Sequence, residues 1–273
     1  MTIRVRTFDR LAEAAAALSS ERGARFFGGG TLVMRSLNEA DPTIAAIVRS
    51  TDPAFHRIVA SSGRIELGAG VTMAAILAER DLAFLHPVAR AIGGPAVREA
   101  ATVGGNLFAP SPYGDFATAL LALDASATLV GGYGQREQPL EELLSSRDRA
   151  GATLVAGVSF NRPRPEAFRF TKVARVRPKG VSVLSIAAVT PLASGRVAGA
   201  RIAYGAIDRA PVRAKAAERA LEGRLLDAAG VAPAVALAAE GVSPVDDAIA
   251  SAWWRREILP VYLRRLLTGE SHP

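Results

Sequence analysis

Two glycine-rich segments contain the residues of this chain whose types and spacing suit ligand binding. Residues 26–31 read Phe-Phe-Gly-Gly-Gly-Thr, and residues 102–106 read Thr-Val-Gly-Gly-Asn. Glycine lets the main chain approach a ligand closely and adopt positive φ, so successive N–H groups can point at one anion. Both segments follow apolar, strand-like residues. Together they predict a pair of loops that close on a diphosphate.

The first segment has the pattern of a strand, a turn and a helix. Residues 24–27 are strand-like, the glycines interrupt them, and residues 32–37 can begin a helix. A phosphate at such a helix start would meet unpaired N–H groups and the positive end of the helix dipole. Thr31 could add a hydroxyl donor. The alternative is a β–α turn that binds no ligand.

The second segment offers more varied polar groups. Thr102 can donate its hydroxyl, Gly104 and Gly105 can form a backbone concavity, and Asn106 carries both a donor and an acceptor. Residues 110–114 contain two prolines, which argues against a regular element there. Asp115 follows at the position expected for a helix N-cap, and its carboxylate could cap the helix, accept from a ligand, or do both.

These motifs resemble the FAD-binding medium subunits of the molybdenum hydroxylases, which are enzymes similar to carbon monoxide dehydrogenase and xanthine dehydrogenase. The resemblance rests on Gly-Gly-Thr in the first segment and on T-V-G-G-N-L-x-x-x-S-P-x-G-D from Thr102 to Asp115. It also includes Phe-Thr-Lys-Val-Ala-Arg at 170–175 and covers residues 8 to about 267. The chain departs from the family pattern at Leu32 and Val181, where relatives often carry acidic residues.

The resemblance implies a non-covalent FAD site built from both glycine segments and nearby polar residues. Residues 26–33 would surround the diphosphate on the adenine side, and Lys172 would place positive charge near the flavin. No acid, base or nucleophile is assigned, because the redox chemistry belongs to the flavin. The implied cofactor contacts are Phe26, Phe27, Gly28, Gly29, Gly30, Thr31, Leu32, Val33, Ile92, Thr102, Val103, Gly104, Gly105, Asn106, Ser111, Asp115 and Lys172.

The composition limits which other redox centres the chain can hold. Its 273 residues include no cysteine, which excludes disulfides, thiolate nucleophiles and cysteine-ligated iron–sulfur or zinc sites. His56, His86 and His272 are too scattered to suggest a metal site. The resemblance therefore implies molybdopterin and [2Fe–2S] clusters on separate partner subunits, in a dimer of heterotrimers. Electrons would pass from the partner's cluster through FAD to NAD⁺, a quinone or another carrier.

Two other functions remain open. A stand-alone FAD oxidase of related fold would need its own substrate pocket and would be expected to attach the flavin through His or Cys. A non-flavin scaffold protein would use the glycine segments as simple turns. The net charge is +7, and nearly all of the basic residues are arginines spread along the chain. No nucleic-acid-binding signature accompanies them, so we expect no nucleic-acid partner.

The N-terminal residues lack a secretory pattern, and no segment approaches the roughly 20 apolar residues of a membrane span, so we expect a cytoplasmic protein. We predict an α+β fold. An FAD-binding domain at 1–163, with subdomains at about 1–55 and 56–163, precedes a C-terminal domain at 164–273. Strands at 168–176, 183–189 and 201–207 predict a three-stranded antiparallel sheet with helices on one face.

The remaining predicted elements lie mostly before that sheet. We expect strands at 25–27, 44–49, 65–67 and 127–130, with a hairpin turn at 130–134. The Gly68-Ala69-Gly70 sequence lacks the third glycine of a dinucleotide fingerprint. Helices are expected at 11–18, 73–79, 88–92, 116–123, 214–221 and 231–239, and a final helix at 253–267 carries arginines on one side.

Overall fold

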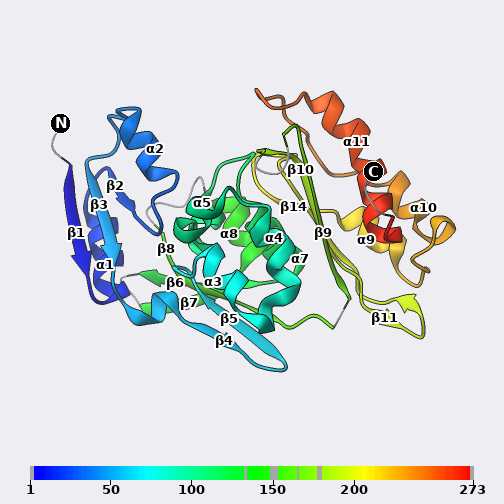
Figure 1. Ribbon diagram of the computed structural model, residues 1–273, viewed down its shortest axis with the longest axis horizontal. Helices are drawn as coiled ribbons and strands as arrows, with labels where there is room; N and C mark the ends of the chain where they lie inside the picture. The colour runs from blue at the N-terminus through cyan, green and yellow to red at the C-terminus, as the bar shows by residue number, and fades with distance from the viewer. Residues whose placement is uncertain (1–2, 132–133, 148–152, 165, 177–179, 271–273) are drawn as a thin grey trace.

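Three sheets lie in a row along the long axis of the molecule, and helices pack between and beside them (Figure 1). The computed structural model describes residues 3–131, 134–147, 153–164, 166–176 and 180–270. The predicted turn residues Gly132 and Tyr133, and also His272, lie outside the described residues. Within the described chain, no helix combines the length and the apolar character needed to cross a membrane.

The N-terminal sheet has three parallel strands in the order β1-β3-β2. These strands are β1 (Arg4–Phe8), β2 (Ala24–Phe26) and β3 (Ala46–Ser50). Helix α1 (Leu11–Ser20) buries its alanine- and leucine-rich side against one face of this sheet. Helix α2 (Val33–Asn38) follows β2, and none of its described residues is buried. The sequence pattern had not indicated β1, because its residues are largely exposed.

The middle sheet has five antiparallel strands in the order β4-β5-β8-β6-β7. They are β4 (Ile58–Ala60), β5 (Arg64–Gly68), β6 (Ser126–Gly131), β7 (Gly134–Pro139) and β8 (Leu154–Asn161). The helices of this region are η1 (Pro53–His56), α3 (Met73–Ala78), η2 (Arg80–Leu85), α4 (His86–Arg90), α5 (Pro95–Ala100), α6 (Val103–Phe108), α7 (Asp115–Ala122) and α8 (Leu140–Ser146).

The C-terminal sheet is antiparallel, as predicted, with the order β14-β13-β10-β9. Its three long strands match the prediction, and a short fourth strand adds one edge. The strands are β9 (Phe168–Ala174), β10 (Ser182–Val189), β13 (Arg201–Gly205) and β14 (Val212–Arg213), with a separate hairpin of β11 (Leu192–Ala193) and β12 (Arg196–Val197). The helices are α9 (Lys215–Leu221), α10 (Ala228–Ala236) and α11 (Ala252–Thr268).

The C-terminal helices pack on one face of this sheet, as predicted, and a helix from the middle region covers the other face. Helix α7, which comes from the middle region, packs on β10 and β13, while α9 and α11 contact the same sheet from the C-terminal side (Figure 1). Every residue of β10 is consequently buried. A strand enclosed on both faces loses the alternation of polar and apolar residues that would reveal which face is covered.

Helix α11 differs from its prediction in the placement of its arginines, because one of them points into the protein. The Arg255 side chain is 0% exposed, so the arginines do not share one solvent-facing side. Its guanidinium donates to the carbonyl oxygens of Val183 and Ala250, at 3.0 and 2.9 Å, and to the Asp247 carboxylate at 2.8 Å. These bonds compensate a buried charge and attach α11 to the start of β10.

Candidate functional site

The first glycine segment forms the strand–turn–helix that its sequence predicts. Phe27 continues the pairing of β2 by donating its N–H to the Val48 carbonyl at 2.7 Å. Beyond it, the consecutive N–H groups from Gly28 to Leu32 donate no hydrogen bond to an acceptor in the described part of the chain. Backbone N–H groups are normally paired with protein or water. This row of donors can therefore receive an anionic ligand.

The side chains of the first segment support its backbone. The Phe26 ring packs edge-on against Phe55, with 5.5 Å between ring centroids. The Phe27 ring lies under Gly30, where an added Cβ would come 2.2 Å from the ring, and Gly30 has φ +76°. Thr31 is exposed, whereas Leu32 and Val33 are half-buried at the start of α2. Only glycine fits at position 30 on both counts.

The two glycine segments touch each other, although 70 residues or so separate them in sequence. A Cβ added to Gly29 would lie 1.5 Å from the carbonyl oxygen of Ala100, and one added to Gly28 would lie 2.9 Å from Thr102 Oγ1. Any side chain at position 29 would therefore force the segments apart. The expected pairing of the two segments in space is present in the structure.

The second segment is the start of helix α6, not the open loop that we expected. Thr102 is the N-cap, and its Oγ1 accepts the Gly105 N–H at 3.0 Å. Val103 and Gly104 are buried, and the Gly104 N–H donates to the Ala69 carbonyl at 2.7 Å. A Cβ on Gly104 would lie 2.8 Å from Ala69 Cβ, so this glycine permits close packing.

Among the remaining residues of the second motif, Asn106 bonds within the protein, whereas Ser111 has no hydrogen-bond partner among the described residues. Asn106 is buried and donates its side-chain N–H to the Thr102 carbonyl at 2.9 Å, so one of its donors serves the helix itself. Gly105 is exposed on the surface of α6. The Ser111 hydroxyl is buried and has no hydrogen-bond partner among the described residues. An unpaired buried hydroxyl is costly, and a bound ligand would satisfy it.

Asp115 and Lys172 form a buried ion pair at the other end of the motif. Lys172 Nζ lies 2.9 Å from Asp115 Oδ2, and it also donates to the Ala91 carbonyl at 2.8 Å. Asp115 Oδ1 accepts from Ser182 Oγ at 2.7 Å. Ile92, the next residue after Ala91, is half-buried against the core. The predicted residues Ile92, Asp115 and Lys172 therefore gather in one place.

The expected capping role of Asp115 is wrong. Gly114, with φ +92°, occupies the N-cap position of α7, and Asp115 is the first helical residue, with its carboxylate turned to Lys172 and Ser182. The prediction missed Ser182, because a serine in an apolar strand gives no signal of its partner. A Cβ on Gly114 would lie 3.0 Å from the Asn106 carbonyl, which places this turn beside the end of α6.

One contact joins helix α2, which follows the first segment, to the turn before α7. Arg35, on α2, donates to the Tyr113 hydroxyl at 3.3 Å, and both side chains are exposed. Hydrogen bonding to Glu39, and secondarily to Tyr113, raises the pKa of the Arg35 guanidinium above its ordinary value. The candidate residues thus extend from Gly28 through α6 and this turn to Lys172.

The two histidines that the structure describes bond to main-chain carbonyl groups. Among the described residues, no group of three or more His, Asp or Glu side chains is placed to hold a metal ion. His56 Nδ1 lies 3.0 Å from the Gly70 carbonyl, and His86 Nε2 lies 3.0 Å from the Glu79 carbonyl. Gly70 and Gly68 both pack closely on Phe55, which accounts for that glycine pair without a nucleotide.

Two protein-family models match most of the chain. Residues 2–160 match the FAD binding domain in molybdopterin dehydrogenase, and residues 169–269 match the CO dehydrogenase flavoprotein C-terminal domain. The chain therefore belongs to the family of FAD-binding domains of molybdopterin dehydrogenases. It is the flavoprotein component of an oxidoreductase of this class, as the sequence resemblance implied.

Individual relatives are more distant. The glyceraldehyde dehydrogenase medium chain of Sulfolobus acidocaldarius is 26% identical over 183 residues, which cover 65% of this chain and 64% of the relative. The 6-hydroxypseudooxynicotine dehydrogenase complex subunit alpha of Paenarthrobacter nicotinovorans is 26% identical over 260 residues, covering 91% and 87%. A chain of the reconstituted CO dehydrogenase from Oligotropha carboxidovorans shares the fold, with a TM-score of 0.87, 22% identity and 99% coverage of both chains.

The residues present fit FAD. The N–H groups from Gly28 to Leu32, which have no acceptor among the described residues, suit a diphosphate, and the buried Ser111 hydroxyl of the second motif offers a further unused group. The Lys172 ammonium has two acceptors, Asp115 and Ala91, and carries a third N–H. Direct contact between these residues and FAD remains a prediction.

Proposed function

We propose that this chain is the FAD-carrying subunit of a multi-subunit molybdenum hydroxylase, and that it passes electrons from a partner's [2Fe–2S] cluster to an external acceptor. The observation that carries the proposal is the contact of Gly29 with Ala100 and Thr102, at the start of the second glycine segment, beside a row of N–H donors that lack acceptors among the described residues. A simple turn in a scaffold protein would have no need for that row.

The chain's own residues bind and position the cofactor. The N–H groups from Gly28 to Leu32 would hold the diphosphate, and the Thr102 cap keeps the adjoining start of α6 rigid. Lys172, held by Asp115 and the Ala91 carbonyl, would place its charge near the flavin end. When bound, the flavin supplies the redox chemistry, since it can exchange electrons with both one-electron and two-electron partners.

The proposed partner subunits are suggested by the absence of cysteine from the sequence and by the names of the relatives. The sequence has no cysteine for a cluster. One relative is named a medium chain, and another is named a subunit of a dehydrogenase complex. We extend these names to propose an iron–sulfur subunit and a molybdopterin subunit as partners, paired into a dimer of heterotrimers. The cytoplasmic location expected from the sequence stays a prediction.

Purification from the native host tests this proposal. The chain should elute with two other polypeptides, and the complex should contain iron, molybdenum and one FAD per copy of this chain. Adding the substrate of the complex without an acceptor should bleach the flavin absorption band, and adding the acceptor should restore it. A monomer that oxidises an organic substrate with its own FAD would overturn the proposal in favour of a stand-alone oxidase.

A subcomplex provides the matched control. The iron–sulfur and molybdopterin subunits without this chain should still reduce their clusters with substrate, but they should not reduce the external acceptor. Adding back this chain loaded with FAD should restore acceptor reduction. If the subcomplex reduces the physiological acceptor at the full rate, then this chain is not on the electron path.

A further inference from the structure

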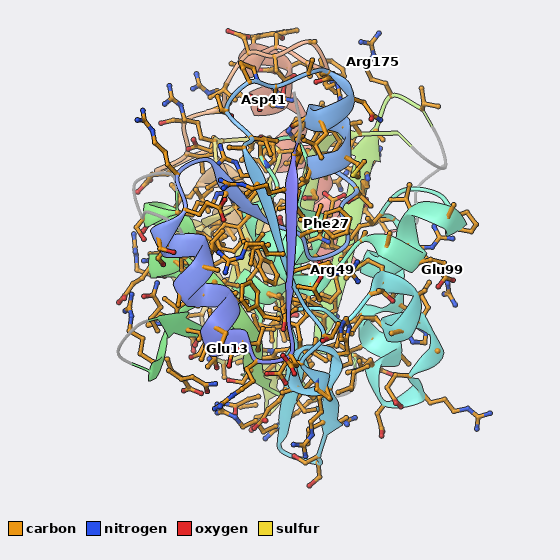
Figure 2. All side chains as sticks on the ribbon, turned by 90° about the vertical axis from the view of Figure 1, so that its left-hand side faces the viewer. Glu13, Phe27, Asp41, Arg49, Glu99 and Arg175 are labelled. Atoms are coloured by element: carbon orange, nitrogen blue, oxygen red, sulfur yellow. The ribbon has the colours of Figure 1, made fainter. Side chains whose placement is uncertain are left out.

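Strand β1 leaves one edge of the N-terminal sheet open. Among the described strands it pairs only with β3, and its residues from Arg4 to Thr7 are all exposed, with Val5 at 63%. Figure 2 looks straight at this edge and shows β1 at the front of the molecule, with no helix or strand drawn before it. An open edge of this kind is a template for pairing with another chain.

The pairing with β3 identifies which backbone groups are available. Arg4 donates its N–H to Ala45, at 3.5 Å, and Phe8 accepts the Thr51 N–H at 2.8 Å. Alternate residues of a strand in a parallel ladder direct their N–H and C=O groups to the same neighbour. The groups of Arg4 and Phe8 therefore face β3, and those of Val5 and Thr7 face outward along the open edge.

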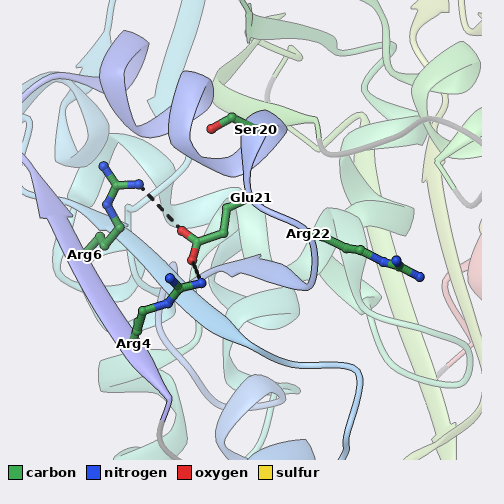
Figure 3. A pocket seen from close by; sticks show the side chains of 5 residues that line it. All are labelled: Arg4, Arg6, Ser20, Glu21 and Arg22. Carbon is green, nitrogen blue, oxygen red and sulfur yellow. Dashed lines mark ion pairs between the residues drawn. The ribbon is translucent and has the colours of Figure 1, made fainter.

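Positive charge gathers beside this edge. A hollow of about 560 Å³ is lined by Arg4, Arg6, Ser20, Glu21 and Arg22. Glu21 forms ion pairs with Arg4 and, at 3.6 Å, with Arg6, and Figure 3 shows its carboxylate between the two guanidinium groups. The Arg4 and Arg6 side chains remain 69% and 49% exposed. Arg22 points away from these groups (Figure 3), so two arginines against one glutamate leave a net positive charge beside β1.

We propose that the open edge of β1 binds an acidic, extended segment of a partner polypeptide, which adds a strand beside Val5 and Thr7 and places carboxylates against Arg4 and Arg6. Main-chain hydrogen bonds would supply affinity, and acidic residues at every second position would supply specificity. A second copy of this chain is disfavoured as the occupant, because pairing β1 with itself would oppose arginine to arginine. The inference does not depend on flavin binding.

A labelled peptide tests the inference on the full chain. A fluorescein-labelled peptide of alternating glutamate and valine should bind saturably in fluorescence anisotropy, at least about tenfold more tightly than the matched peptide of lysine and valine. Val5→Pro removes an outward N–H but no bond to β3, so this variant should fold and lose at least about tenfold in affinity. Val5→Ala is the matched control and should bind as the parent does.

Two further probes distinguish the contribution of charge to peptide binding from the contribution of main-chain hydrogen bonds. Arg6→Gln should weaken binding of the acidic peptide and leave the protein folded, since the ion pair of Arg6 with Glu21 is long, at 3.6 Å, and the Arg6 side chain is 49% exposed. The same peptide with N-methyl groups at alternate positions keeps its charge but cannot pair along one edge, and it should not bind. Equal binding of the methylated and unmethylated peptides, equal binding to Val5→Pro and Val5→Ala, or no saturable binding up to about 1 mM would each overturn the inference.

Discussion

Lys172 Nζ lies 2.9 Å from Asp115 Oδ2, and this ion pair joins strand β9 to the first turn of helix α7. The two side chains are only 13% and 6% exposed. Ser182 satisfies the other carboxylate oxygen, and the Ala91 carbonyl accepts a second N–H of the lysine. Residues from four separate elements or loops thus meet at one buried charge pair, which is stable only while every member keeps its partners.

Replacing one member of this pair should destabilise the protein strongly. Lys172→Met leaves a buried carboxylate without its cation, and we expect a loss of about 3–5 kcal/mol in the free energy of unfolding. The double variant Asp115→Asn with Lys172→Met should recover most of that loss, because neither charge remains. Urea denaturation of the flavin-free protein measures both.

An exposed pair provides the control. Lys215 and Glu141 form an ion pair at 2.6 Å, but their side chains are 59% and 45% exposed, so Lys215→Met should change the free energy of unfolding by about 0.5 kcal/mol or less. If Lys172 also serves the cofactor, the double variant should regain stability without regaining FAD affinity. Equal effects of Lys172→Met and Lys215→Met would show that the buried pair has no special importance.

Gly29→Ala should disturb the contact between the glycine segments. The new methyl group would lie 1.5 Å from the Ala100 carbonyl, so one segment must move. We expect a loss of at least about 1–3 kcal/mol in stability and a drop of tenfold or more, roughly, in FAD affinity. Gly63→Ala is the matched control, since nothing described lies within 4 Å of its added Cβ. Full FAD content in Gly29→Ala would refute the role given to this contact.

Ser111→Ala tests the unpaired hydroxyl. Removing a buried hydroxyl that has no partner should leave the flavin-free protein as stable as before, or slightly more so. If FAD satisfies this hydroxyl, its dissociation constant should rise by about fivefold to tenfold. Tyr204→Phe removes another unpaired buried hydroxyl, in the C-terminal core, and should not change FAD affinity. Isothermal titration compares the variants, and identical dissociation constants would remove Ser111 from the site.

The first glycine segment was predictable because its signals are local. A short strand, three glycines and a helix start follow one another directly, and the structure shows them in that order. The second motif was located correctly but interpreted wrongly, as an open loop. Thr102 and Gly105 follow the spacing of a helix N-cap, and that pattern was attributed to ligand binding instead.

Other features were beyond prediction because they depend on contacts that are distant in sequence. The pairing of the two glycine segments was expected, but the particular contact between Gly29 and Ala100 forms only when the N-terminal sheet packs on the middle region. Ser182 donates to Asp115, and Arg255 donates to the Val183 carbonyl. Both partners are distant in sequence, and the neighbouring residues give no signal of them. Strand β1 has few buried residues, so the hydrophobic pattern that reveals most strands is absent from it.

Asp247 should contribute to the pH dependence of stability. Burial opposes its ionisation, but hydrogen bonds from the Ala250 and Ile249 N–H groups and from Arg255 outweigh this and hold the pKa of Asp247 below its ordinary value. A lowered carboxyl pKa stabilises the folded state at neutral pH, and that contribution is lost as the pH falls through the lowered value. Asp247→Asn should therefore unfold at a lower temperature than the parent at neutral pH, and this difference should shrink as the pH falls through the lowered pKa of Asp247. A pH-independent difference would contradict this assignment.

We propose that this chain holds one FAD through its two glycine segments. Titration of flavin-free protein with FAD, followed by acid precipitation, tests this binding most directly. We expect saturation at one FAD per chain, with all of the yellow colour released into the supernatant, since the chain has no cysteine and both described histidines are bonded to carbonyls. Protein that takes up no FAD, or that retains the flavin on the precipitated polypeptide, would contradict this proposal.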